Sequence, residues 1–205
     1  VNNVGEVSGS SKDANGDRHP FFYSDDTGML ELDADGATTG HDINDEGQVI
    51  GYNPDTNVIY RYDSIADSIE YFTSPDGIQS GSSTFAMNDS GQFVGRTQFD
   101  IPKGKNKENP RAFRYTDGVG FETLGDSQEY FGMGINNHGD VVMYRAPATS
   151  AYVYLDTSGQ LVNLDDAVTG PETEDFTNAT GRQPRDINDY GQITGRVLYG
   201  VGSLQ

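Results

Sequence analysis

One short motif occurs five times in this chain and constrains its fold more than any other feature. Each copy has an apolar residue, then Asn, then Asp or Asn, then a variable residue and Gly, and ends in a short apolar run. The first glycines of the copies stand at positions 5, 47, 91, 139 and 191, so successive copies are 42, 44, 48 and 52 residues apart. A period in the forties is typical of propellers and related repeat architectures.

The motif predicts a tight β-hairpin turn. Asn and Asp favour the start of a turn because their side chains bond nearby backbone groups, and Gly takes the left-handed position that closes it. The following residues, such as Gln48–Gly51, then begin the next strand. Five such turns at one period indicate one structural unit repeated along the chain.

A second recurrent element follows each of the first four motifs at a variable distance. It is a short aromatic segment, found at 20–23, 58–62, 112–115 and 151–154. Alternating aromatic and β-branched residues favour strands. A polar turn and a fourth apolar segment follow, ending at Leu32, Phe72, Leu124 and Leu164.

Each repeat therefore has about four short strands, the content of one propeller blade. We predict an all-β, β-propeller-like array of four-stranded repeats in a single domain, residues 1–205. A β-solenoid is the alternative, although its coils are usually shorter than these repeats. The predicted repeats are four full ones and a partial fifth, at 1–42, 43–86, 87–134, 135–186 and 187–205.

The first repeat lacks a strand before its motif, and the fifth motif supplies that strand plus one more. A closed ring of four blades would leave the extra strand, around Gln192–Thr194, redundant. The sequence therefore favours a part of a larger propeller, or a subunit of a larger assembly, because proteins usually cover exposed sheet edges.

The motif and the aromatic segment together resemble the bacterial HAF repeat, which is named for a His-Ala-Phe start to its aromatic strand. His19-Pro20-Phe21 comes closest to that start, whereas Arg111-Ala112-Phe113 keeps the frame without the histidine. The resemblance covers essentially the whole chain. It implies a secreted or surface protein with propeller-like repeats and no general enzymatic activity.

Composition narrows the classes of partner. The formal net charge is −19, from 13 basic and 32 acidic residues. Such a surface repels nucleic-acid phosphates and anionic membranes, and no segment has the length and apolarity of a membrane span, so we expect neither nucleic-acid binding nor membrane insertion. The chain has no cysteine, which excludes disulfides and thiolate chemistry. The resemblance to the HAF repeat implies an extracellular, cell-surface or periplasmic location.

The best metal candidate is the loop with Asp13, Asn15 and Asp17, whose oxygen-bearing side chains alternate around Gly16. Oxygen ligands in a Gly-containing loop suit Ca²⁺, although the distal glutamate of a helical calcium loop is missing and a plain polar turn is the competing interpretation. Asp33–Gly36 is a weaker version of the same pattern. Calcium is the one cofactor that the sequence suggests.

No catalytic residue can be assigned. The only histidines, at 19, 41 and 138, fall in different repeats, and with 32 acidic residues a carboxylate pair for glycoside chemistry has almost no specificity. The arginines at 61, 114 and 145 lie on or near predicted strands and, with the tyrosines, are candidates for binding an acidic glycan or a protein. Two long loops, 101–110 and 169–184, are further candidates because loops on rigid scaffolds often carry function.

The residues that recur in every repeat are thus those that form turns and strands. This favours a non-enzymatic extracellular or cell-surface scaffold that mediates protein or glycan binding or assembly. The alternatives are a carbohydrate-active propeller enzyme, of the polysaccharide lyase or glycoside hydrolase type, and a structural subunit of a larger assembly.

Overall fold

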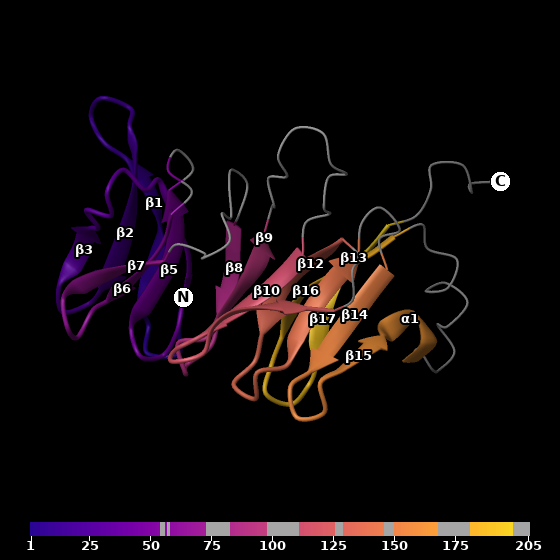
Figure 1. Cartoon of the computed structure of the whole chain (residues 1–205). Helices are drawn as coiled ribbons and strands as arrows, with labels where there is room; N and C mark the ends of the chain where they lie inside the picture. The colour runs from indigo at the N-terminus through magenta and orange to yellow at the C-terminus, as the bar shows by residue number, and fades with distance from the viewer. Residues whose placement is uncertain are drawn as a thin grey trace, which may run out of the picture.

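In a computed structural model of the chain, the described residues form five antiparallel β-sheets that follow one another along the sequence (Figure 1). The structure describes residues 1–53, 56, 58–72, 83–97, 111–125, 129–145, 150–167 and 181–198. The candidate loop at 101–110 lies outside these residues. Of the second candidate loop, only the last four residues are described, and they begin a strand.

We number the sheets as blades 1 to 5. Blade 1 has three strands, β1 (Val7–Lys12), β2 (Arg18–Ser24) and β3 (Gly28–Glu31). Blade 2 has four, β4 (Thr39–Ile43), β5 (Gln48–Asn53), β6 (Val58–Asp63) and β7 (Ser68–Phe72). Blade 3 contains β8 (Ser83–Met87), β9 (Phe93–Thr97), β10 (Arg111–Thr116) and β11 (Gly120–Leu124).

Blade 4 contains β12 (Tyr130–Ile135), β13 (Val141–Arg145), β14 (Ser150–Leu155) and β15 (Gln160–Asn163), followed by the single turn of helix α1 (Leu164–Ala167). Blade 5 is the hairpin of β16 (Gly181–Ile187) and β17 (Ile193–Leu198). No described helix has both the length and the apolarity needed to cross a membrane.

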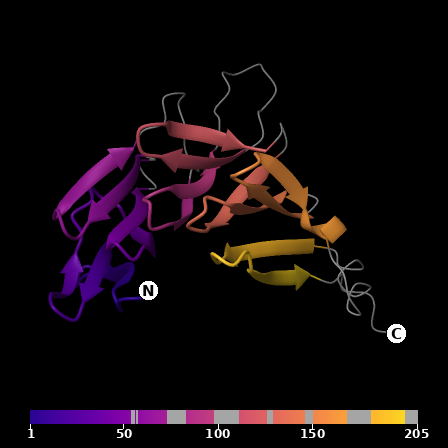
Figure 2. The same cartoon turned by 90° about the horizontal axis from the view of Figure 1, so that it is seen from below.

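The blades stand side by side around an arc, seen most clearly in Figure 2, where the colour runs from the indigo of blade 1 to the yellow of blade 5. The prediction of an all-β, propeller-like array of four-stranded repeats is confirmed by this arrangement. The boundaries of the predicted repeats and of the blades differ by one strand. Each predicted repeat begins at a motif, whereas blades 2 to 5 each also include the strand before the motif, because that strand pairs with the strand after it. In the described residues β16 pairs with β17, and β1 pairs with β2.

The motif forms the turn between the first and second strands of blades 2 to 5 and precedes β1 in blade 1. In each copy the Gly amide donates to the Asn carbonyl and the Asn amide donates to the carbonyl of the residue after Gly, as at Asn88, Gly91 and Gln92. The five motif glycines all have positive φ, between 73° and 91°. A side chain is strained in that region, and the predicted hairpin turn is therefore confirmed.

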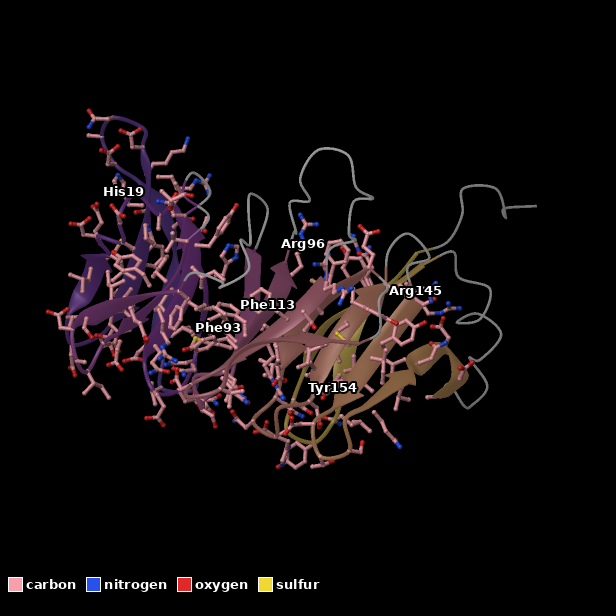
Figure 3. All side chains as sticks on the ribbon, in the orientation of Figure 1. His19, Phe93, Arg96, Phe113, Arg145 and Tyr154 are labelled. Atoms are coloured by element: carbon pink, nitrogen blue, oxygen red, sulfur yellow. The ribbon has the colours of Figure 1, made fainter. Side chains whose placement is uncertain are left out.

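The apolar core lies between successive blades. Four clusters of buried side chains fill the four spaces between neighbouring blades. Between blades 2 and 3, for example, Phe93 packs edge-on against Phe72 and Phe113, with ring centroids 5.2 and 6.2 Å apart (Figure 3). The aromatic strands thus serve blade-to-blade packing, in which edge-to-face rings are favourable.

Candidate functional site

The side chains of the motif asparagines join each blade to the next. The Asn2 Nδ2 donates to the Asn44 carbonyl, Asn44 to Asn88, and Asn88 to Asn136, at 2.9, 3.0 and 2.9 Å. Asn136 continues the series to the Asn188 carbonyl at 3.2 Å. We call this series the asparagine ladder. It runs in one direction along the inner edge of the arc.

The same asparagines also hold their own turns. The Oδ1 of Asn88 accepts the Ser90 and Gln92 amides, and its Nδ2 donates to the Gln92 Oε1 as well as to the next blade. Asn44, Asn88 and Asn136 are buried. A buried amide with all of these partners is fixed in place, because leaving any of its donors or acceptors unpaired costs free energy.

The residue after each asparagine forms a second, more exposed row of contacts. Its carboxylate or amide oxygen accepts the backbone N–H of the same position in the preceding blade, at 2.7–2.9 Å. The row contains Asn3, Asp45, Asp89, Asn137 and Asp189. The Asn137 Nδ2 donates to both neighbouring carboxylates, Asp89 at 2.7 Å and Asp189 at 3.1 Å, so this amide separates two negative charges.

These rows border a polar depression of about 260 Å³ at the inner edge of the arc. We call it the axial hollow. It is lined by the last residues of the first strands and by the motif residues that follow them. Its lining includes Asp42 of blade 2 and Asp186 of blade 5, which stand at the same place in their strands, two residues before the motif asparagine. Ala86 and Gly134 occupy that place in blades 3 and 4.

Asp42 is the carboxylate in the hollow whose ionisation is most clearly altered by its surroundings. Burial raises its pKa above the usual value; the N–H groups of Met87 and Ile43 oppose this, and the nearby charge of Asp186 adds to it. The Asp42 Oδ2 accepts the Met87 amide at 2.9 Å. Paired carboxylates in different environments are one pattern from which general acid and base roles arise.

Two of the three arginines singled out in the sequence are structural. Arg114 donates to Glu122 on the neighbouring strand at 2.6 Å and to Asp156 and the Gly139 carbonyl of the next blade at 2.6 and 2.9 Å. Arg61 makes the equivalent bonds to Glu70, to Asp117 and to the Gly91 carbonyl. Both guanidinium groups are buried, so they hold blades together and are not exposed to a ligand.

The predicted metal ligands Asp13, Asn15 and Asp17 lie at the tip of the β1–β2 hairpin. The Asp13 carboxylate accepts the backbone amides of Asn15 and Asp17 at 2.9 and 2.8 Å and the Asn15 Nδ2 at 3.0 Å. Partial burial acts to raise the pKa of Asp13, but these hydrogen bonds outweigh it and hold the pKa below the usual value. The described part of the chain brings together no group of three His, Asp or Glu side chains with metal-ligand geometry.

The other polar candidates are scattered. His19 lies beside Glu31, with Nδ1 3.0 Å from the carboxylate, in the N-terminal hairpin, and His41 and His138 are exposed in other blades. Asp33–Gly36 forms a turn in which the Ala37 amide donates to the Ala34 carbonyl. The structure therefore does not bring the three histidines together.

Sequence reasoning missed Asp42 and Asp186. The available signal was their common offset from the motif, since both stand two residues before the motif asparagine. That offset gives no indication that blades 2 and 5 lie near each other, which depends on how far the arc curls.

No protein-family profile matches the sequence, and no characterised protein matches it at a significant level. Several solved structures are similar in shape. A catalytically inactive variant of virginiamycin B lyase from Staphylococcus aureus with quinupristin is 15% identical, with a TM-score of 0.47, over 95% of this chain and 71% of that one.

A selenomethionine-substituted form of virginiamycin B lyase from the same organism is 15% identical, with a TM-score of 0.43, over 93% of this chain and 72% of that one. A streptogramin B lyase is 11% identical, with a TM-score of 0.47, over 95% of this chain and 62% of that one. These similarities concern overall shape at low identity, and the assignment of the fold rests on the sheets described above.

Proposed function

We propose that this chain is a non-enzymatic extracellular or cell-surface scaffold, built of HAF-type repeats, that mediates protein or glycan binding or assembly. The observation that carries the proposal is the asparagine ladder. The side chains that recur in every repeat are engaged in hydrogen bonds within and between blades, as Asn44, Asn88 and Asn136 are. Recurrence in this chain therefore serves the scaffold, and ligand binding falls to residues that differ between blades.

The axial hollow is the feature that best supports binding. It is concave and polar, and it is positioned by residues that the ladder holds rigidly. Sites on a rigid frame keep their geometry without an additional ordering cost when a ligand binds. Hydroxyl-rich glycans and the polar side chains of a protein both match its carboxylate and amide lining.

The test is to measure binding and turnover together. The intact protein is screened against a panel of neutral and acidic polysaccharides by calorimetry, and the same mixtures are assayed for new reducing ends and for unsaturated products. We expect binding without product. Detection of the protein on intact cells with an antibody, before and after protease treatment of the cell surface, tests the proposed location.

One observation favours the carbohydrate-active alternative, namely that Asp42 and Asp186 line the same hollow and that the pKa of Asp42 is raised. A carboxyl group whose pKa is raised is better suited to act as a general acid in glycoside chemistry. Product formation that is abolished in Asp42→Asn would replace the scaffold proposal by this alternative. Asp33→Asn, which alters an exposed carboxylate outside the hollow, is the matched control.

A further inference from the structure

Several arginines gather on blades 3 to 5, on the side remote from the motif turns. The second strands run from the motif turn towards this side, and Arg145 is the last residue of β13 while Arg96 is the last but one of β9. Figure 3 shows Arg96 and Arg145 on the upper side of the molecule, away from Tyr154. Blade 5 adds Arg185 and Arg196. We call Arg96, Arg145, Arg185 and Arg196 the arginine row.

The repeat explains why these side chains come together. Arg96, Tyr144 and Arg196 occupy the same strand position, one residue after Gly95, Met143 and Gly195, respectively, so neighbouring blades present them at the same height. Arg185 is placed by a β-bulge in β16, where the pairing shifts between Pro184 and Asp186. Bulges commonly redirect a side chain near functional sites.

Two stacked aromatic rings lie beside Arg96. The guanidinium carbon of Arg96 lies 4.9 Å from the centroid of the Phe131 ring in the next blade, and Phe131 stacks on Tyr144 with centroids 4.5 Å apart and planes 8° apart. Burial raises the pKa of Tyr144, while the positive charges of Arg96, Arg185 and Arg196 act to lower it. One arginine of blade 3 and two of blade 5 therefore lie near one tyrosine of blade 4.

Arg145, Arg185 and Arg196 form no ion pair with a carboxylate among the described residues, although acidic residues outnumber basic ones by 32 to 13 in this chain. The buried Nε of Arg145 has no hydrogen-bond partner among the described residues. Arg185 is exposed, and its side chain makes no hydrogen bond or ion pair with another residue in the described part of the chain. The Nε of Arg196 donates to the Gln183 Oε1 at 2.8 Å, which orients an otherwise exposed guanidinium group.

These features differ from those of the arginines with structural roles. Arg61 and Arg114 are buried and bonded to carboxylates on two sides, and Arg182 is paired with Asp165 at 3.1 Å. In a chain with so many acidic residues, a carboxylate partner is readily provided for an arginine whose role is to form an ion pair. An oriented guanidinium group that has no carboxylate partner is suited to bind the carboxylate of a ligand. Its forked N–H donors can form two parallel hydrogen bonds with the two carboxylate oxygens.

We propose that the arginine row binds the carboxylate groups of a short acidic oligosaccharide, a uronate of a few sugar units. The inference rests on the proposed function, of which it names the ligand class. The row extends over three blades, and this suits a ligand with a carboxylate on successive sugars. A short ligand avoids the rest of the acidic surface, whose charge is screened over about 8 Å at physiological salt.

The experiment is calorimetric titration of the intact protein with tri-galacturonate. The test variant is the double substitution Arg185→Gln and Arg196→Gln, because both side chains are exposed and their loss leaves the core intact. Arg18→Gln removes an equally exposed arginine from blade 1 and is the matched control. We expect roughly tenfold weaker binding in the double variant, unchanged binding in the control, and affinity that falls as salt rises.

Equal affinity of the double variant and the parent, with both melting at the same temperature, would overturn the inference. So would equal affinity for the neutral galactose trisaccharide, or equal affinity for citrate and inorganic phosphate, which would indicate a site for any small anion. The proposed function fails separately, when no glycan in the panel and no protein partner binds any surface of the intact chain.

Discussion

Two kinds of contact join neighbouring blades. They differ at the residue that pairs with the third residue after the motif glycine. Blades 2 and 3 place Arg61 and Arg114 there, each bonded to a carboxylate of its own blade and one of the next. Blades 1 and 4 place Phe22 and Val153 there. Phe22 lies 5.8 Å from the Tyr62 ring of blade 2, and Val153 belongs to the apolar cluster between blades 4 and 5.

The comparison separates what the repeat requires from what it tolerates. The inner ladder of Asn2, Asn44, Asn88, Asn136 and Asn188 is the same at all four joints. The contact at the position of Arg61 and Arg114 is charged at two joints and apolar at the other two, because either kind of side chain fills the space between two sheets. A buried ion pair and a well-packed apolar group of similar volume can contribute equally to stability.

The largest expected effect comes from breaking one charged joint. Arg114→Val leaves Glu122 and Asp156 without their cation, and we expect a loss of about 2–3 kcal/mol in the free energy of unfolding, because both carboxylates are partly exposed and are partly compensated by water. Chemical denaturation with urea measures the loss. Arg18→Gln, an exposed arginine in blade 1, should change little.

The double variant Arg114→Val with Glu122→Val makes this joint resemble the Val153–Val162 pair of blade 4. It should recover most of the lost stability. A double variant as unstable as Arg114→Val alone would show that the two kinds of joint are not interchangeable.

Substitutions in the asparagine ladder should cost more stability at an interior blade than at blade 5, the last blade described. Asn88→Ala removes four hydrogen bonds from a buried position, whereas Asn188→Ala removes three from an exposed one. We expect losses of about 2 and about 1 kcal/mol, respectively. Equal losses in matched urea titrations would contradict the claim that the ladder contributes between blades.

A smaller loss of stability is expected for a substitution at Asn137, which belongs to the second row of contacts, formed by the residues that follow the ladder asparagines. Asn137→Asp replaces an amide that donates to Asp89 and Asp189 by a third carboxylate. We expect a loss of about 1 kcal/mol, with part of it restored by added salt, because the new repulsion lies at the surface. A loss that does not respond to salt would assign the effect to the missing hydrogen bonds alone. Asn3→Asp is the control with a single acidic neighbour.

The axial hollow predicts a dependence on pH. Since the pKa of Asp42 is raised in the folded state, first by burial, the folded protein holds this proton more tightly than the unfolded chain does. This contribution to stability is present at low pH and is lost as pH rises through the folded pKa. Asp42→Asn keeps an acceptor for the Met87 amide and should raise Tm by about 2 °C at neutral pH.

The Asp42→Asn difference should disappear at about pH 3, where the parent carboxyl group is also protonated. Thermal scans of both proteins across this range provide the measurement. A variant that is less stable than the parent at neutral pH would show that the ionised carboxylate contributes to the fold.

The smallest expected effect concerns the calcium prediction. Asp13 already accepts three N–H bonds within its own turn, and among the described residues no group of three acidic or histidine side chains forms there. We expect a small rise in Tm in millimolar Ca²⁺ that EDTA reverses and that Asp17→Asn removes. The absence of any shift would leave the loop as a plain polar turn.

Much of the fold could be predicted because its signals are local. The motif specifies a turn through Asn and Gly, and the alternation of Tyr60 and Tyr62, or Phe113 and Tyr115, specifies a strand. Both follow from the conformational preferences of neighbouring residues. Arg61 and Arg114, which the sequence made candidates for binding, are buried between blades, and the sequence does not show this because the exposure of an arginine depends on what the next blade places against it.

The sequence by itself determined the repeating unit, its hairpin turns and the acidic character of the surface, since each depends on residue type and short spacing. Only the tertiary structure decided that the motif asparagines form a ladder, that Asp42 and Asp186 share one hollow, and that Arg96, Arg185 and Arg196 lie near Tyr144. These contacts join residues that are more than forty positions apart, and they exist because the blades curl into an arc.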